Sequence, residues 1–214
     1  MRVRKVKKKY NKIVIGIDQS YTRTGISIAV DGELKVVSSI DYKGLSSRAE
    51  KRNALRGTLG IIISKNAHKA NEVVILCERV RTFSKSFGKK GSANQDNAGG
   101  MGLNPGYLKM TGALVATIVD VAFEYGVNVY SVDTRSWKSK IVGNSKARIR
   151  NGKRDAKSET VNFVQGLGFD LFVREKKVGK NKGERLYNDD AADSACISLY
   201  GFIPKNQQKL VLEQ

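Results

Sequence analysis

Two short apolar segments of this chain each end at an acidic residue, and they limit its possible folds more than any other feature. The segment IVIGI is followed by Asp18, and the segment VVILC is followed by Glu78. Segments of this length that are rich in β-branched residues are typical of central strands, which helices cover on both faces. We therefore expect strands over residues 12–17 and 72–77, each with a carboxylate at its carboxyl end.

The rest of the chain predicts the elements around these two strands. Further strands are expected over residues 24–30, 34–40 and 127–132, and the first two are joined by the turn-forming sequence Asp31-Gly32-Glu33. Helical spacing of apolar residues predicts helices over residues 46–69, 107–125, 158–167 and 189–201. This order predicts an α/β fold, with a mixed five-stranded sheet flanked by helices. Its sheet combines a three-strand antiparallel meander with two parallel strands.

The length of 214 residues favours one domain. We assign that domain to residues 12–203, between a basic flexible N-terminal arm (1–11) and a C-terminal tail (204–214). Residues 79–105 and 174–185 are rich in Lys, Gly and Asn, which predicts long loops.

The chain carries 39 Lys and Arg against 20 Asp and Glu, a formal net charge of +19. So large an excess favours a phosphate backbone as partner, although a plain basic surface or a ribosome-like RNA-binding protein remains an alternative.

No apolar run approaches the ~20 residues of a membrane span, and no signal peptide is visible. Cys77 and Cys196 are interpreted as free buried thiols of a reducing compartment.

The carboxylates are expected to converge at one edge of the sheet. A right-handed crossover through the intervening helix makes the strands that end at Asp18 and Glu78 parallel and adjacent. Asp190 and Asp193, in the segment DDAADSACISLYG, are three residues apart and share one helix face. Small and apolar residues surround this pair, so the helix should pack on the sheet, with Asp189 as a candidate cap.

Several convergent carboxylates without Cys or His suit Mg²⁺ or Mn²⁺. Two such ions ~4 Å apart activate water and stabilise the leaving oxygen of a phosphodiester. His68, the only histidine, is interpreted as a surface residue, and neither a zinc ligand set nor a nucleotide-binding glycine loop is present. Simpler roles stay open for each acid alone, as turn or helix caps. Asp133, at the end of the 127–132 strand, is interpreted as a turn residue.

The strings GIDQSYTRTG, VVILCERV, RSWKSKIVG and DDAADS, spread over residues 13–202, resemble the RuvC-like Holliday junction resolvases of the RNase H-like superfamily, including phage-encoded forms. The resemblance implies an RNase H-like fold in which Asp18, Glu78, Asp190 and Asp193 hold two divalent ions. It also implies that Lys138 and Lys157 lie near the scissile phosphate. For any one lysine of such a basic chain, a plain phosphate contact or solvent exposure is an equal alternative.

The same resemblance implies a homodimer that cuts two symmetric strands of a four-way DNA junction in the bacterial cytoplasm. The helix over 107–125 would supply the dimer face, and a buried core helix explains its composition equally well.

The family carries an aromatic wedge in the loop after the Glu78 position; here arginines come first, and Phe83 and Phe87 follow. Basic insertions at 79–105, 144–154 and 174–185 predict a broad grip on branched DNA. The candidate DNA-binding residues are Arg79, Arg81, Phe83, Lys85, Lys138, Lys140, Lys146 and Arg148.

The sequence thus predicts a metal-dependent, structure-selective endonuclease. One alternative is a non-catalytic nucleic-acid-binding protein on the same fold. Another is an actin-like ATPase or sugar kinase half-domain, because GIDQSYTRTG also resembles the first phosphate loop of those proteins. The short length, the basic charge and the lack of a second such loop count against this last alternative.

Overall fold

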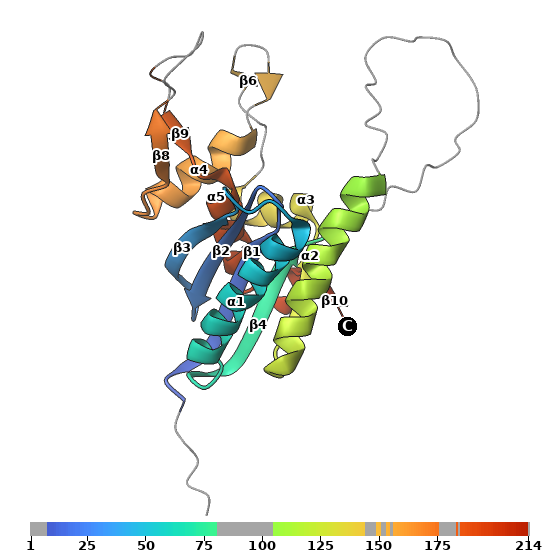
Figure 1. The fold of residues 1–214 in the computed structure, drawn as a ribbon. Coiled ribbons are helices and arrows are strands. Elements are labelled where there is room, and N and C mark those ends of the chain that lie inside the picture. The colour runs from blue at the N-terminus through green and yellow to red at the C-terminus, as the bar shows by residue number, and fades with distance from the viewer. Residues whose placement is uncertain are drawn as a thin grey trace, which may run out of the picture.

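A six-stranded mixed sheet forms the centre of the molecule, in the order β10-β5-β4-β1-β2-β3 (Figure 1). The computed structural model describes residues 8–80, 105–143, 149–150, 153–154, 156–175, 183 and 185–213. The strands of this sheet are β1 (Tyr10–Asp18), β2 (Arg23–Val30), β3 (Glu33–Asp41), β4 (Ala70–Glu78), β5 (Asn128–Val132) and β10 (Leu210–Glu213). Strands β1, β4 and β5 run parallel, and the other neighbours pair antiparallel.

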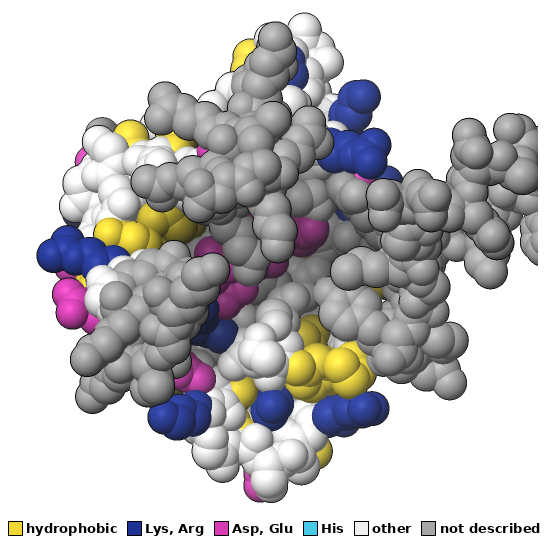
Figure 2. Space-filling model, turned by 90° about the horizontal axis from the view of Figure 1, so that it is seen from above, with side chains coloured by type: hydrophobic (Ala, Val, Ile, Leu, Met, Phe, Trp, Pro, Cys, Tyr) yellow, Lys and Arg dark blue, Asp and Glu magenta, His cyan; other side chains and the backbone are white. Residues whose placement is uncertain are grey.

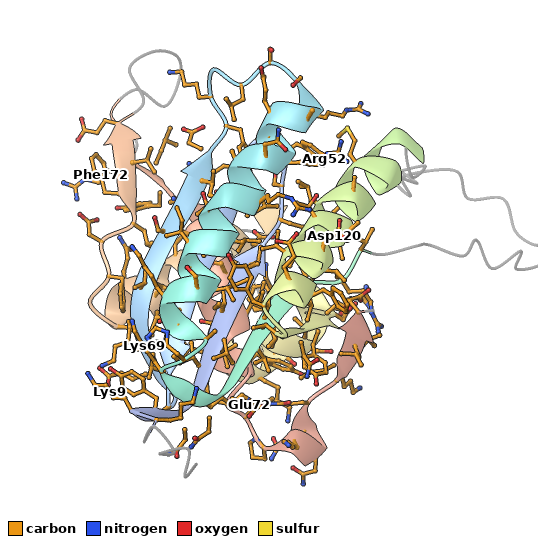
Figure 3. The ribbon with its side chains drawn as sticks, turned by 60° about the horizontal axis from the view of Figure 1, so that its bottom comes forward. Lys9, Arg52, Lys69, Glu72, Asp120 and Phe172 are labelled. Atoms are coloured by element: carbon orange, nitrogen blue, oxygen red, sulfur yellow. The ribbon has the colours of Figure 1, made fainter. Side chains whose placement is uncertain are left out.

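Helices cover both faces of the sheet. They are α1 (Arg48–Asn66), α2 (Pro105–Glu124), α3 (Thr134–Trp137), α4 (Ala156–Gly166) and α5 (Asp189–Tyr200). Helices α1 and α2 lie side by side on one face, where they bury Ile13, Ile15 and Ile17 of β1 (Figures 1 and 3). Helices α3, α4 and α5 bury Val14 and the rest of the opposite face. Strand β1 is thus buried on both sides, as its unbroken apolar sequence predicts.

Two glycines let α5 approach the sheet closely. A Cβ atom on Gly16 of β1 would lie 2.3 Å from the carbonyl oxygen of Ser194. A Cβ atom on Gly25 of β2 would lie 1.8 Å from the carbonyl oxygen of Asp190. Small buried residues of α5, such as Ala191 and Ala195, face the sheet from the helix side. The sheet and helix therefore meet backbone to backbone just where α5 carries its acids.

Local sequence signals explain several element ends. Asp31 and Gly32 take φ values of 48° and 90° in the β2–β3 turn, as the predicted hairpin requires. Helix α1 begins at a capping box, in which the Ser47 side chain accepts from the Glu50 N–H and the Glu50 carboxylate accepts from the Ser47 N–H. His68 is exposed in the turn after α1, and both cysteines are buried free thiols, as predicted.

The sheet has one strand more than the five that the sequence predicts. Residues expected as a C-terminal tail form a short 3₁₀ turn, η2 (Lys205–Gln207), and then β10, which pairs with β5. Two small hairpins lie at the predicted basic insertions: β6 (Ile149–Arg150) with β7 (Lys153–Arg154) within residues 144–154, and β8 (Phe172–Glu175) with β9 (Arg185–Tyr187) at the two ends of residues 174–185. Strands of two to four residues are too short to show an alternating pattern.

Helix α3 and the following π-helical turn η1 (Lys138–Val142) also fall in a segment for which the sequence predicts neither helix nor strand. They bury Trp137 against the face formed by α4 and α5. In the described part of the chain, no helix is both long and apolar enough to cross a membrane.

Candidate active site

Asp18 and Glu78 stand at the ends of neighbouring parallel strands. The β1–β4 ladder runs from Tyr10↔Ala70 to Ile17↔Cys77, so the next residue on each strand is acidic. The carboxyl ends of both strands point to the upper rim of the sheet in Figure 1. Seen from that side, acidic side chains gather near the middle of the face, with Lys and Arg around it (Figure 2). Ligands of open α/β sheets bind at such a rim.

Helix α5 brings the other two acids to the same place. Its N-terminus is fixed by Asn188, whose side chain accepts from Ala191 N (3.1 Å) and donates to Ser39 Oγ of β3 (2.8 Å). Gly25, which touches the Asp190 backbone, is the ladder partner of Asp18. The backbone of Asp190 therefore lies directly beside the end of β1. The helix cap is Asn188, so the expectation that Asp189 caps this helix was wrong.

The charges of the other three acids act on Asp18. Burial raises the pKa of Asp18 well above its ordinary value, and the negative charges of Glu78, Asp193 and Asp190 raise it further, against a smaller opposing effect of Lys138. Burial also raises the pKa of Asp193, although Lys138 and Thr160 oppose this shift. The structure thus brings all four predicted acids together, while their role as metal ligands stays a prediction.

Two cations lie against the acids of α5. The Arg23 guanidinium, at the start of β2, places Nε 2.8 Å from Asp190 Oδ2 and Nη2 3.4 Å from Asp189 Oδ1. The Lys138 ammonium lies 3.6 Å from Asp193 Oδ2. Within the described residues, no three His, Cys, Asp or Glu side chains are arranged to hold a metal ion. The acids of α5 are instead paired with Arg23 and Lys138.

The donor set nevertheless fits a hard divalent cation. Its members are carboxylates, the ligands that Mg²⁺ and Mn²⁺ prefer. Asp193 Oδ1 is buried and has no hydrogen-bond partner among the residues that the structure describes. A buried carboxylate oxygen without a partner is costly, and a bound cation would remove that cost.

Of the other predicted site residues, Lys138 lies beside the acids, and several lie outside the residues that the structure describes. Lys138 is the first residue of η1 and lies in the site, whereas Lys140 donates to Gln207 Oε1 of η2 (3.1 Å). Arg79 is exposed directly after Glu78, and Lys157 belongs to the first turn of α4. Outside the described residues lie Arg81, Phe83, Lys85, Phe87, Lys146 and Arg148. Asp133 caps α3 by accepting from Arg135 N (2.8 Å), in line with its interpretation as a turn residue.

Sequence reasoning missed several residues that contact the acids, among them Gln19, Arg23 and Thr134. Gln19 is bonded to the Glu78 backbone, Arg23 pairs with Asp190, and the Thr134 hydroxyl donates to Glu78 Oε1. Gln19 directly follows Asp18, and Thr134 lies two residues after the end of β5, so each lies at the carboxyl end of a parallel strand. This position in the chain was the signal that could have identified Gln19 and Thr134, whereas Arg23, at the start of β2, has no such signal.

A pH-dependent stability difference should follow from the raised pKa of Asp18. Ionised Asp18 lowers the free energy of unfolding above its folded-state pKa, and the penalty fades as the pH falls towards the ordinary value. Asp18→Asn removes the charge. We expect the metal-free variant to be more stable than the unmodified protein near about pH 8, with the difference shrinking towards about pH 4. Urea unfolding of both proteins in EDTA measures it, and a difference independent of pH would contradict the reasoning.

Comparisons with known proteins identify the fold. No protein-family model matches the sequence, and no curated protein matches it either. Thermus thermophilus RuvC in complex with a Holliday junction substrate is similar, with a TM-score of 0.54 and 18% identity over 87% of this chain and 90% of that one. Thermus thermophilus RuvC alone gives a TM-score of 0.54 and 18% identity, over 93% of this chain and 99% of that one.

A third solved structure, the yeast mitochondrial Holliday junction resolvase, gives a TM-score of 0.48 and 15% identity, over 92% of this chain and 79% of that one. The likeness to RuvC at 18% identity shows the fold. The chain has the RNase H-like fold of RuvC, as predicted, and its sheet has β10 in addition to the five predicted strands.

Proposed function

We propose that this chain is a divalent-metal-dependent, structure-selective endonuclease that resolves Holliday junctions and related branched DNA by phosphodiester hydrolysis. One observation carries the proposal: Asp18 and Glu78 end adjacent parallel strands, and helix α5 places the backbone of Asp190 against Gly25, the ladder partner of Asp18. Its support is the likeness of the fold to a RuvC that was solved with a Holliday junction substrate, together with the net charge of +19.

In this proposal Asp18, Glu78, Asp190 and Asp193 hold two Mg²⁺ or Mn²⁺ ions. When bound, such ions activate a water molecule and stabilise the leaving oxygen of a phosphodiester. The chain supplies the rest. Thr134 and Gln19 hold Glu78 in place through hydrogen bonds. The Lys138 side chain is 22% exposed, and its ammonium lies beside Asp193. In this proposal that ammonium contacts the phosphate and offsets the charge that builds on it. Lys157 is proposed as a second such lysine.

The proposed substrate requires two active sites acting on symmetric strands, which a homodimer provides. We propose α2 as the dimer face. Helix α2 buries Leu114, Ile118 and Val121 against α1 and the sheet, while Phe123 at its far end is 85% exposed. Ala116 and Asp120 are also exposed, so a side of this helix is open to a second copy. The place of action would be the bacterial cytoplasm, as for a phage-encoded resolvase.

A synthetic four-way junction tests this function. The full chain is incubated with the junction and with a linear duplex of the same sequence, in Mg²⁺, in Mn²⁺ and in EDTA. We expect paired nicks in opposite strands of the junction, a requirement for divalent ions, and little cleavage of the duplex. Binding of the junction without cleavage in either ion would contradict the proposal.

A non-catalytic DNA-binding protein on the same fold is the second candidate. The observation that favours it is the pairing of Asp190 with Arg23 and of Asp193 with Lys138, since paired carboxylates need no metal. It predicts the outcome just described, namely tight junction binding that divalent ions do not convert into cleavage.

A further inference from the structure

The side chain of Gln19 is bonded to the backbone of Glu78 on both of its polar groups. Gln19 Nε2 donates to Glu78 O (2.5 Å), and Glu78 N donates to Gln19 Oε1 (3.2 Å). Gln19 is 7% exposed. These two bonds lie just beyond Ile17↔Cys77, the last pair of the β1–β4 ladder.

The geometry explains why a carboxamide suits this position. The N–H and C=O of one strand residue point to the same side, and for Glu78 that side faces β1. A carboxamide offers one acceptor and one donor in a plane, as a peptide group does. The Gln19 side chain therefore continues the ladder by one step, at the level where the main chain of β1 turns away.

Glu78 is fixed from its other side as well. Arg79 N donates to Val132 O (2.8 Å), which keeps the end of β4 paired with β5. The Thr134 hydroxyl, in the first residue of α3, donates to Glu78 Oε1. The backbone of Glu78 is thus held between two strands, and one carboxylate oxygen is held by a third element.

The hydrogen bonds that hold Glu78 oppose the electrostatic repulsion between Glu78 and Asp18. Asp18 and Glu78 are carboxylates at the ends of adjacent parallel strands, so they repel each other when both are ionised. Without a restraint, the two strand ends would relieve this repulsion by moving apart. A hydrogen-bonded pair of groups at the very end of the ladder resists that movement.

We propose that Gln19 is a positioning residue, which holds Glu78 beside Asp18 at the separation that the active site needs, while Thr134 orients the Glu78 carboxylate. The inference rests on the proposed function and assigns to it a residue outside the four acids. Gln19 acts through Glu78 and is buried, so its loss should lower kcat and the affinity for Mn²⁺ and leave KM for the junction unchanged.

The test compares two glutamines by the same substitution. Gln19→Met keeps the length of the side chain and removes both bonds to Glu78. Gln208→Met is the matched control, because Gln208, which lies between α5 and β10, is half-buried and donates to two backbone oxygens, those of Tyr200 (3.3 Å) and Ile203 (2.8 Å). Junction kinetics, Mn²⁺ calorimetry on the DNA-free protein and amide hydrogen exchange of Glu78 by NMR are measured for each.

We expect Gln19→Met to lower kcat and Mn²⁺ affinity by about 10- to 100-fold, as for other residues that orient metal ligands. Exchange of the Glu78 amide should become faster, because Gln19 Oε1 no longer accepts from it. Gln208→Met should leave all three quantities unchanged. Equal losses in both variants would show a general effect on stability and overturn the inference.

Two further outcomes separate this inference from the proposed function. Junction cleavage that Gln19→Met leaves unchanged would overturn the inference alone, whereas absence of cleavage by the unmodified protein would count against the proposed function. The Glu78 amide of the unmodified protein decides the case if Gln19→Met fails to fold. Slow exchange of that amide is expected, and exchange as fast as that of an exposed amide would overturn the inference.

Discussion

Asp18→Asn should reduce junction cleavage by roughly 10³-fold or more and leave junction binding intact. Asp18 is the acid on which the charges of the other three act, so it is expected to contribute to binding of the divalent ions. Loss of metal-based charge stabilisation worth several kcal/mol corresponds to a rate loss of about this size. Binding should persist or tighten, because the substitution removes a negative charge that repels the phosphate backbone. Single-turnover cleavage in Mn²⁺ and fluorescence anisotropy in EDTA measure the two quantities.

Asp31→Asn is the matched control for this prediction. Asp31 lies in the β2–β3 turn, where it accepts from Asn11 N (3.1 Å) and Lys12 N (2.8 Å), near the amino end of β1. Its φ of 48° is one that Asn also adopts, so the same substitution there should leave cleavage unchanged. Divalent ions should also raise the Tm of the unmodified protein and raise it less for Asp18→Asn. Loss of junction binding by Asp18→Asn would instead indicate a structural role.

The convergence of the acids could be predicted because strong local patterns and one topological rule determine it. The segments before Asp18 and Glu78 are wholly apolar, which identifies central strands. A helix between them makes the strands parallel through a right-handed crossover. The small residues of α5 indicate the helix face that meets the sheet, and they place Asp190 and Asp193 near the same rim.

The pairing of these acids with cations could not be predicted. Arg23 and Asp190 are 167 residues apart, and the chain offers 39 Lys and Arg as partners. Nothing local distinguishes Arg23 from the others, because the contact depends on how closely α5 lies on β2. Gln19 directly follows a predicted strand end, which places it near the site, but no local pattern indicates its two bonds to the Glu78 backbone.

The short strands were missed because their sequences carry too little information. Strand β10 has four residues after a polar segment, and it is stabilised by pairing with the edge of β5 and by a hydrogen bond from Ser131 Oγ to Glu213 Oε1. Tertiary context determines such strands more than their intrinsic propensity does.

Gly25→Ala should damage both the fold and the active site. The new Cβ would lie 1.8 Å from the carbonyl oxygen and 2.3 Å from the carbonyl carbon of Asp190, and both are backbone atoms that no side-chain rotation can move away. Helix α5 must therefore shift at the residue that begins the acidic pair. We expect a loss of about 1–3 kcal/mol in the free energy of unfolding, the usual cost of overpacking. Urea unfolding at neutral pH measures this loss.

The same shift should lower junction cleavage beyond the effect of the lost stability. A displacement on the order of 1 Å in a positioned catalytic group costs about 10²-fold in rate. We therefore expect such a loss in Gly25→Ala under conditions where the variant is fully folded, with junction binding retained. Gly57→Ala is the control, since Gly57 is exposed in α1 and a Cβ there meets no atom within 4 Å. That variant should gain up to about 1 kcal/mol from helix propensity and cleave normally. If folded Gly25→Ala cleaves at the unmodified rate, the acids of α5 do not depend on this close approach to β2, and the proposed site geometry is wrong.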